Sequence, residues 1–330
     1  MKALETMLAS GDTISVNVDI DAIRFYYGIH GLTNCTSPES DPVWNFGVPR
    51  FLKLFAELGM SATFFVVASD LVSMSDGGAV QDLTEVKRRR QLVRSMVAQG
   101  HEVASHSFGH SYALSRKSFQ DINADLQRAV DILYEVTGVP IIGFRAPGYN
   151  LSPSLIDAIE KSGAIYSSSR LPSPPYFVAK WLVMLKGALI GQPSRSIIGE
   201  IASPFLSRRP YRHREGLLEL PMSVIPLLRL PAIGTFFTLY GDRGIDWLLP
   251  HLKQENWLNL EFHAIDLVDR SDAGVTQNLV SRQPDLSTSM TQKQSLFTNW
   301  LLELAQGRSN QTLKEVANNI DRSSYHLSKF

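Results

Sequence analysis

Short apolar runs alternate with longer amphipathic segments along most of the chain, a pattern that predicts strands followed by helices. The predicted strands span 13–18, 62–67, 102–105, 141–144, 217–220 and 257–262. The predicted helices span 44–58, 85–99, 119–137, 244–254, 292–306 and 313–319, and a further one begins at Ser152-Pro153. Repeated strand–helix units imply parallel strands, arranged either in a barrel or in an open sheet.

This alternation stops after Ile165. Residues 171–215 are rich in proline, serine and arginine around an apolar stretch, 176–191, and we interpret them as an insertion. The chain resumes the pattern afterwards, and 270–330 supplies a polar loop and the last helices. We therefore expect a single domain over 1–330, completed by its C-terminal segment.

The apolar stretch of the insertion contains Lys180 and Lys186, so it is too short and too charged to predict a transmembrane helix. A basic stretch, 208–214, follows it. One interpretation is a lid or packing helix with a solvated basic loop. The other is peripheral membrane contact through 176–214, with arginines on phosphate head groups.

Composition narrows the class of protein. Lysine plus arginine and aspartate plus glutamate are both 32, and this balance argues against nucleic-acid binding. Cys35 is the only cysteine, which excludes an intramolecular disulfide and fits a reducing compartment. Residues 1–12 lack the apolar run of a secretory signal, so we expect a cytoplasmic protein.

The histidines point to chemistry. Of eight histidines in the chain, three fall within 101–110, and His106 and His110 are spaced four apart. Neutral imidazole binds zinc-like metals, and a site that activates water needs three protein ligands and one open position. The chain offers carboxylates at Asp19 and Asp21. The segment that begins His101-Glu102 does not have the His-Glu-x-x-His spacing of a helical zinc protease.

Candidate site residues all come directly after predicted strands. They are Asp19, Asp21, His106, His110, Arg145 and His263. In a barrel of parallel strands the carboxyl ends of the strands meet on one face, where active sites are built. We therefore expect these six side chains to lie together in a hydrolytic site.

Four motifs in this order resemble the NodB-homology family, the polysaccharide deacetylases of carbohydrate esterase family four. They are Asp19-Ile-Asp21, His106-Ser-Phe-Gly-His110, Arg145-Ala-Pro-Gly-Tyr149 and Leu260-Glu-Phe-His263. The resemblance covers roughly 13–170 and 215–317, and the spacing of the two aspartates is similar to that of intracellular and lipid-linked-sugar members. It implies a distorted (β/α)7-8 barrel.

The resemblance also implies roles. Asp21, His106 and His110 would hold a divalent metal, zinc by default, although cobalt, nickel or manganese also suit such ligands. Asp19 would act as the general base, oriented by Arg145, and His263 as the general acid. Backbone N–H groups near Gly148 and Tyr149 would stabilise the oxyanion.

One family feature is missing. The family uses a further aspartate to tune the late histidine, and the matching stretch here, Tyr166-Ser-Ser-Ser169, has no acid. Asp266 or Glu219 could take its place. Without any partner, the pKa of His263 would be lower and the histidine a poorer acid.

We thus expect a hydrolase that removes an acetyl or formyl group from the nitrogen of a sugar or glycan, including a lipid-linked one such as a polyprenyl-phosphate sugar. Two alternatives stay open: a hydrolase of a linear or cyclic non-sugar amide, and an inactive carbohydrate-binding barrel. Individually, Asp19 could cap a loop, Arg145 could belong to a turn, and His263 could be a core residue. The aromatic run Phe25-Tyr26-Tyr27 could stack on a sugar or pack in the core. The sequence does not indicate the oligomeric state.

Overall fold

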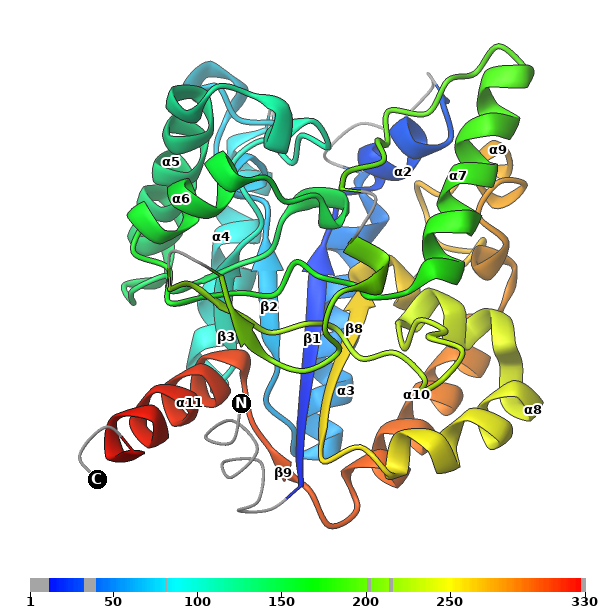
Figure 1. Ribbon diagram of the computed structural model, residues 1–330. Coiled ribbons are helices and arrows are strands. Elements are labelled where there is room, and N and C mark those ends of the chain that lie inside the picture. Colours follow the sequence, from blue (N-terminus) through cyan, green and yellow to red (C-terminus); the bar gives the residue numbers. More distant parts are fainter. Residues whose placement is uncertain (1–11, 33–39, 81, 201–202, 214–215, 328–330) are drawn as a thin grey trace.

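The computed structural model describes residues 12–32, 40–80, 82–200, 203–213 and 216–327 of the 330-residue chain. Parallel strands run through the centre and helices cover their outer side (Figure 1). Within the described residues, every helix is too short or too polar to cross a membrane.

The sheet is parallel except at one edge. Its strands are β1 (Thr13–Ile20), β2 (Thr63–Val66), β3 (Glu102–Ser105), β4 (Gly143–Phe144), β5 (Tyr166–Ser167), β6 (Tyr211–Arg212), β7 (Leu218–Glu219), β8 (Trp257–His263) and β9 (Ser309–Asn310). The order is β6-β7-β5-β4-β3-β2-β1-β8, with β9 beside β1 and only β6 antiparallel to its neighbour. Each central strand therefore delivers its carboxyl end to the same side.

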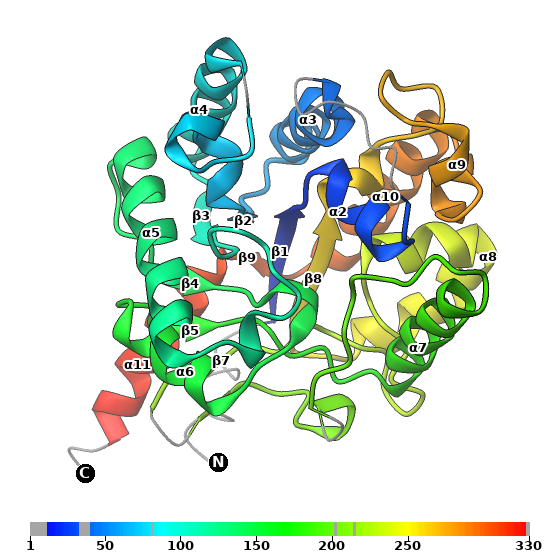
Figure 2. The same ribbon diagram turned by 90° about the horizontal axis from the view of Figure 1, so that it is seen from above.

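The sheet curls until its two ends are linked. After β7 the chain reaches β8, where the Ser223 and Asn259 backbones form a hydrogen bond of 2.9 Å. Inside the curl, the Asn259 side chain accepts from Asn17 at 2.6 Å and donates to the Leu220 and Pro221 carbonyls. These polar contacts lie inside the curled sheet, which forms a distorted barrel seen from above in Figure 2.

The helices are α2 (Ile23–Ile29), α3 (Val48–Leu58), α4 (Leu83–Ala98), α5 (Phe119–Thr137), α6 (Pro153–Lys161), α7 (Pro174–Leu189), α8 (Gly234–Lys253), α9 (Gln277–Val280), α10 (Met290–Ala305) and α11 (Leu313–Leu327). Apolar and polar residues alternate along β1, and this alternation explains which face of the sheet the helices cover. Ile14, Val16 and Val18 belong to the main apolar core, while Asn17 and Asp19, at the intervening positions, are hydrogen-bonded inside the curl.

The predicted elements compare closely with the observed ones. All six predicted strands are present, and the helix predicted over 119–137 has those bounds. The hydrophobic pattern gave no prediction for α2, for α9 or for the two-residue strands β5, β6 and β9. It placed the start of α8 ten residues late, because Gly241, with φ of 62° and ψ of −177°, breaks the helical pattern between Gly234 and Lys253.

Candidate metal and catalytic site

Asp21, His106 and His110 meet where β1 and β3 end. His106 Nε2 and His110 Nε2 lie 3.3 and 3.0 Å from Asp21 Oδ1, and the two imidazole nitrogens are 3.1 Å apart. All three side chains are buried. Three potential ligand atoms thus converge on one point, as a tetrahedral metal site with an open position requires.

Two details of this cluster fit a cation. His106 Nδ1 donates to the Arg145 carbonyl at 2.8 Å, which leaves the lone pair of Nε2 facing the cluster. Asp21 Oδ1 is buried and has no hydrogen-bond partner among the described residues. Since a buried carboxylate oxygen without a donor is costly, a metal ion would satisfy what the protein leaves unsatisfied.

The backbone around His110 is strained. Ser107 and His110 have φ values of 67° and 50°, in the left-handed region that non-glycine residues rarely adopt. Ser107 Oγ accepts the His110 backbone N–H at 3.0 Å and so stabilises this turn. Strain of this kind often accompanies a functional site, and here it turns the second imidazole toward the first.

Protonation of the cluster also suits metal binding. Burial would raise the pKa of Asp21, but His110 and His106 outweigh it and hold that pKa well below its usual value. Burial lowers the pKa of His110, whereas Asp19 and Asp21 outweigh burial and raise the pKa of His106, so a cation would bind His106 by displacing a proton. An ionised carboxylate and a neutral imidazole are the forms that bind a metal.

Asp19 is held by Arg145. Arg145 Nη1 donates to Asp19 Oδ1 at 2.6 Å, and the guanidinium also donates to the Ser168 backbone carbonyl and hydroxyl. The other oxygen, Asp19 Oδ2, lies 3.7 Å from His106 Nε2. One oxygen of the Asp19 carboxylate is therefore fixed and the other faces the metal ligands, the geometry expected of a positioned base.

His263 has a charged neighbour, Glu261, that was not among the predicted site residues. Glu261 Oε1 lies 4.0 Å from His263 Nε2 and 3.6 Å from Arg145 Nη1, and it accepts from the Tyr149 hydroxyl at 2.7 Å. Burial would lower the pKa of His263, but Glu261, Asp19 and Asp21 outweigh it and raise that pKa to about 9. Since side chains two apart on a strand share a face, the Leu260-Glu-Phe-His263 motif could have revealed Glu261.

Asp266 contacts the backbone of His263. Its Oδ2 accepts the His263 backbone N–H at 2.8 Å, and its Oδ1 accepts from the Thr235 hydroxyl at 2.7 Å. Asp266 therefore fixes the turn after β8, and its charge is a smaller influence on the imidazole than that of Glu261.

The serines of the stretch 166–169, which stands where the family has its further aspartate, have a structural role. Ser168 accepts from Arg145, and Ser169 Oγ accepts the Ala146 backbone N–H at 2.9 Å. Glu219 caps the backbone of Ser169 and Arg170 and contacts His213 Nε2 at 3.1 Å. Glu219 thus serves a different histidine from the one in the candidate site.

Gly148 and Tyr149 form a tight turn after β4, with φ values of 62° and 63°. The Tyr149 backbone N–H donates to the Ala146 carbonyl at 3.0 Å, so it is already engaged. The Gly148 carbonyl accepts from Lys180 Nζ at 3.0 Å. The expected oxyanion role of this turn stays a prediction, and the engaged N–H makes Gly148 the better donor of the two.

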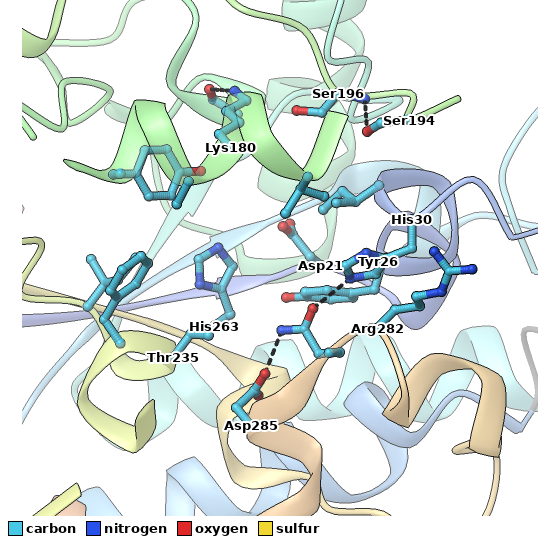
Figure 3. A pocket seen from close by; sticks show the side chains of 18 of the residues that line it. Asp21, Tyr26, His30, Lys180, Ser194, Ser196, Thr235, His263, Arg282 and Asp285 are labelled. Atoms are coloured by element: carbon cyan, nitrogen blue, oxygen red, sulfur yellow. Dashed lines mark hydrogen bonds between the residues drawn. The ribbon is translucent and has the colours of Figure 1, made fainter. Parts of the chain in front are cut away.

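A cavity of about 280 Å³ opens above these groups. Its floor includes Asp19, Asp21, His106 and His263, and one wall is the inner side of α7. Lys180 on α7 and Asp285 near α9 lie on opposite sides of it, with Asp21, Tyr26 and His263 between them (Figure 3). The apolar side chains of this wall are Tyr176, Ala179, Val183 and Met184, and Ile233, Phe236 and Leu239 at the start of α8 line the cavity beside them.

The aromatic run on α2 divides between cavity and core. Tyr26 lines the cavity, and its buried hydroxyl has no hydrogen-bond partner among the described residues. Phe25 packs on the His110 ring at 4.2 Å, whereas the Tyr27 hydroxyl contacts Thr276 at 2.5 Å. Only Tyr26 is therefore placed to touch a ligand in this cavity.

The two parts of the insertion separate in space. The apolar part forms α7, while Arg208 contacts Glu255 at 3.2 Å and Arg212 donates to the Gly216 carbonyl at 2.6 Å. These arginines are engaged by the protein itself. Arg214 lies outside the described residues.

Comparison with known proteins places this geometry in context. Residues 40–166 match the family model described as polysaccharide deacetylase. The chain is 27% identical over 171 residues to a peptidoglycan deacetylase from Helicobacter pylori, which covers 50% of this chain and 52% of that protein. It is 28% identical over 163 residues to a peptidoglycan deacetylase-like protein from Gibberella zeae, which covers 47% and 43%. The chain spans about half the length of these curated relatives.

Solved structures support the fold. A Mycobacterium smegmatis protein assigned to the polysaccharide deacetylases superposes with a TM-score of 0.53 at 17% identity, over 95% of this chain and 92% of that one. An allantoinase superposes with the same TM-score of 0.53 at 15% identity, over 93% and 89%. The barrel predicted from the sequence is therefore confirmed. The matched span 40–166 contains both histidine ligand candidates and Arg145, and the fold adds Asp19, Asp21 and His263 from outside it.

Proposed function

We propose that this chain, whose residues 40–166 match the polysaccharide deacetylase family model, is a metal-dependent hydrolase that removes an N-acyl group from a sugar or glycan. The observation that carries the proposal is the convergence of metal-ligand, base and acid candidates on the floor of one cavity.

Asp21, His106 and His110 would hold the metal. Their one carboxylate and two imidazoles suit zinc, and cobalt, nickel or manganese as second choices. Such a cation, when bound, would polarise the amide carbonyl and acidify water. The neighbouring group of Asp19, Glu261 and His263 also brings ligand atoms together. Because Arg145 already places a positive charge beside both of its carboxylates, we assign no second metal there.

The remaining residues move protons. Asp19 takes a proton from the attacking water, and Arg145 keeps that carboxylate oriented. The hydroxyl of the water joins the acyl carbon, the C–N bond breaks, and His263 gives a proton to the departing amine. The products are a carboxylic acid and a free amine. A histidine whose pKa is raised by nearby carboxylates is protonated at neutral pH, as this role requires.

Glu261 supports activity over the inactive-barrel alternative. That alternative rests on the aspartate missing from 166–169. Glu261 offers a buried carboxylate at His263 from another strand, and Tyr149 and Arg145 hold it in place. Glu261 could thus raise the pKa of His263 in place of the family's aspartate.

For the substrate, the peptidoglycan deacetylase relatives favour an N-acetylated glycan, and we keep formyl as the second acyl group. The apolar wall of the cavity favours a glycan with an apolar carrier, such as a lipid-linked sugar. Product analysis on N-acyl sugars against linear and cyclic amides separates these substrates from the non-sugar alternative. A cytoplasmic location stays a prediction.

The first experiment is metal analysis of the purified protein beside its His106→Ala variant, followed by assays on N-acetylated glycan fragments. About one divalent ion per chain, lost in the variant, together with release of acetate, is the expected result. A protein that binds no zinc, cobalt, nickel or manganese after reconstitution would contradict the proposal.

A further inference from the structure

Helix α7 presents an apolar surface to solvent. Of its residues Pro174–Leu189 only Gly187 is buried. Leu189 is 77% exposed, Val178 58%, Leu182 52% and Trp181 50%. Val183 and Leu185 are also exposed, as is Ile190 directly after the helix. A helix that is apolar around its circumference normally lies in a core, so this surface calls for a partner.

The helix is held firmly in its position. Lys180 Nζ donates to the Gly148 carbonyl at 3.0 Å, and the Tyr176 ring packs on the Tyr149 ring at 5.4 Å. At the other end the Gly187 Cα approaches the Gln192 carbonyl so closely that an added Cβ would lie 2.5 Å from it. The exposed side of α7 is therefore a built surface of the folded protein.

Charge distinguishes between possible partners. Residues 174–189 contain two lysines and no acidic residue. Lys186 is exposed among the apolar side chains of α7. Arg195 is exposed in the segment that follows the helix, where its backbone N–H donates to the Gly28 carbonyl at 2.9 Å, and Arg282 reaches this segment through a 2.8 Å hydrogen bond to Gln192. The next acidic residue, Glu200, is paired with Arg170 at 2.8 Å. An apolar face with a cationic border fits an anionic lipid surface, whereas a second copy would bring like charges together.

The same helix is a wall of the catalytic cavity. Ala179, Val183 and Met184 line the cavity on its inner side, and Leu239 of α8, 52% exposed, lines it as well. Both ribbon views place α7 at the outer rim of the molecule (Figures 1 and 2). A lipid surface in contact with α7 would therefore lie next to the mouth of the cavity.

We infer that α7 docks the protein on an anionic lipid bilayer, with Trp181, Leu182 and Leu189 at the interface. The docking itself is independent of the reaction. Its consequence, access to a substrate that is anchored in the bilayer, rests on the proposed function.

The test is co-sedimentation of the full chain with vesicles of phosphatidylcholine, alone or mixed with phosphatidylglycerol. We expect at least about tenfold stronger binding to the anionic vesicles, and about tenfold or greater loss in the variant Trp181→Ser/Leu182→Ser/Leu189→Ser. Lys186→Ser/Arg195→Ser should lower the preference for anionic vesicles by about fivefold per cation. A matched control, Leu83→Ser/Trp247→Ser/Leu302→Ser, removes equally exposed apolar side chains elsewhere and should bind as the parent does.

Circular dichroism and metal content establish that the variants fold. Failure of the parent to bind either vesicle, or equal binding by the α7 variant, overturns the inference. If light scattering shows that the parent is a dimer and the α7 variant a monomer, and the parent does not bind vesicles, the surface belongs to the contact with a second copy. Assays on short soluble N-acyl sugars separate the two proposals: vesicle binding without hydrolysis refutes the proposed function alone, and hydrolysis without vesicle binding refutes the docking alone.

Discussion

The floor and the outer wall of the cavity are built in opposite ways. The floor collects polar side chains from the ends of β1, β3, β4 and β8, all buried except the half-buried His263, and connected by contacts between 2.6 and 4.0 Å. The wall is one helix, α7, whose side chains are mostly exposed and apolar and which is anchored by Lys180. The chemistry is thus fixed by the sheet, while contact with large partners is left to an added helix.

This difference predicts how the two regions respond to substitution. Changes in the floor should lower turnover on every substrate, because each buried group has defined partners. Changes on the outer side of α7 should affect only what the protein binds. The following substitutions test the floor in order of expected effect.

The largest effect is expected from His106→Ala. It removes one of three converging ligand candidates, so the metal content should fall to background and turnover by about a thousandfold or more. Elemental analysis and an acetate-release assay measure both. His101→Ala is the matched control, since His101 lies away from the cavity and its Nδ1 accepts the Ala62 backbone N–H. Retained metal in His106→Ala would refute the ligand assignment.

A smaller loss is expected from Asp19→Asn. The amide keeps the shape of the side chain but cannot accept a proton from water, so turnover should fall about 10²–10⁴-fold while the metal stays bound. Loss of metal in this variant would make Asp19 a ligand. Turnover equal to that of the parent would exclude Asp19 as the base.

Glu261→Gln should lower turnover by about tenfold, because it removes the carboxylate nearest to His263 Nε2. The acid form of His263 is protonated, so activity should be lost as pH rises through about 9, or through a lower value when a cation at Asp21 adds positive charge. In Glu261→Gln, the loss of activity on the alkaline side of the pH–rate profile should therefore occur at lower pH.

Two controls separate this effect from a general one. Glu219→Gln alters an equally buried carboxylate that contacts His213, and it should leave the pH of this loss unchanged. In a His263→Gln background the effect of Glu261→Gln on turnover should disappear, because the two residues act together. Additive losses would show that Glu261 acts through Arg145 instead.

The sequence predicted the floor better than the wall for a physical reason. Asp19, His106, Arg145 and His263 each lie at the carboxyl end of a strand or directly after it, and parallel strands must bring their carboxyl ends together. Glu261 was missed although the period of two along β8 places it on the face of His263. A carboxylate within an apolar strand has no local signal of its partner, since Arg145 and Tyr149 come from more than a hundred residues earlier.

The wall could be predicted only in part. The apolar stretch 176–191 indicated a helix, and the observed bounds are Pro174–Leu189. The arginines that follow it seemed to belong to the same surface, but Arg208 and Arg212 contact Glu255 and the Gly216 carbonyl instead. Proximity in sequence did not predict proximity in space, because the chain leaves α7 for the edge of the sheet, where Arg212 is part of β6.

The smallest effect is expected where floor and wall meet. Tyr26 lines the cavity, and its hydroxyl lacks a partner among the described residues. If this hydroxyl donates to the substrate, Tyr26→Phe should lower kcat/KM by about two- to tenfold, the value of one neutral hydrogen bond, with metal content and Tm unchanged. Tyr240→Phe is the control, because the buried Tyr240 hydroxyl also has no hydrogen-bond partner among the described residues but Tyr240 does not line the cavity; kcat/KM should stay unaltered. If both variants have the kinetics of the parent, the Tyr26 hydroxyl does not bind the substrate. The substrate would then be held by the apolar wall and the metal site alone, and Tyr26 would take no part in recognition.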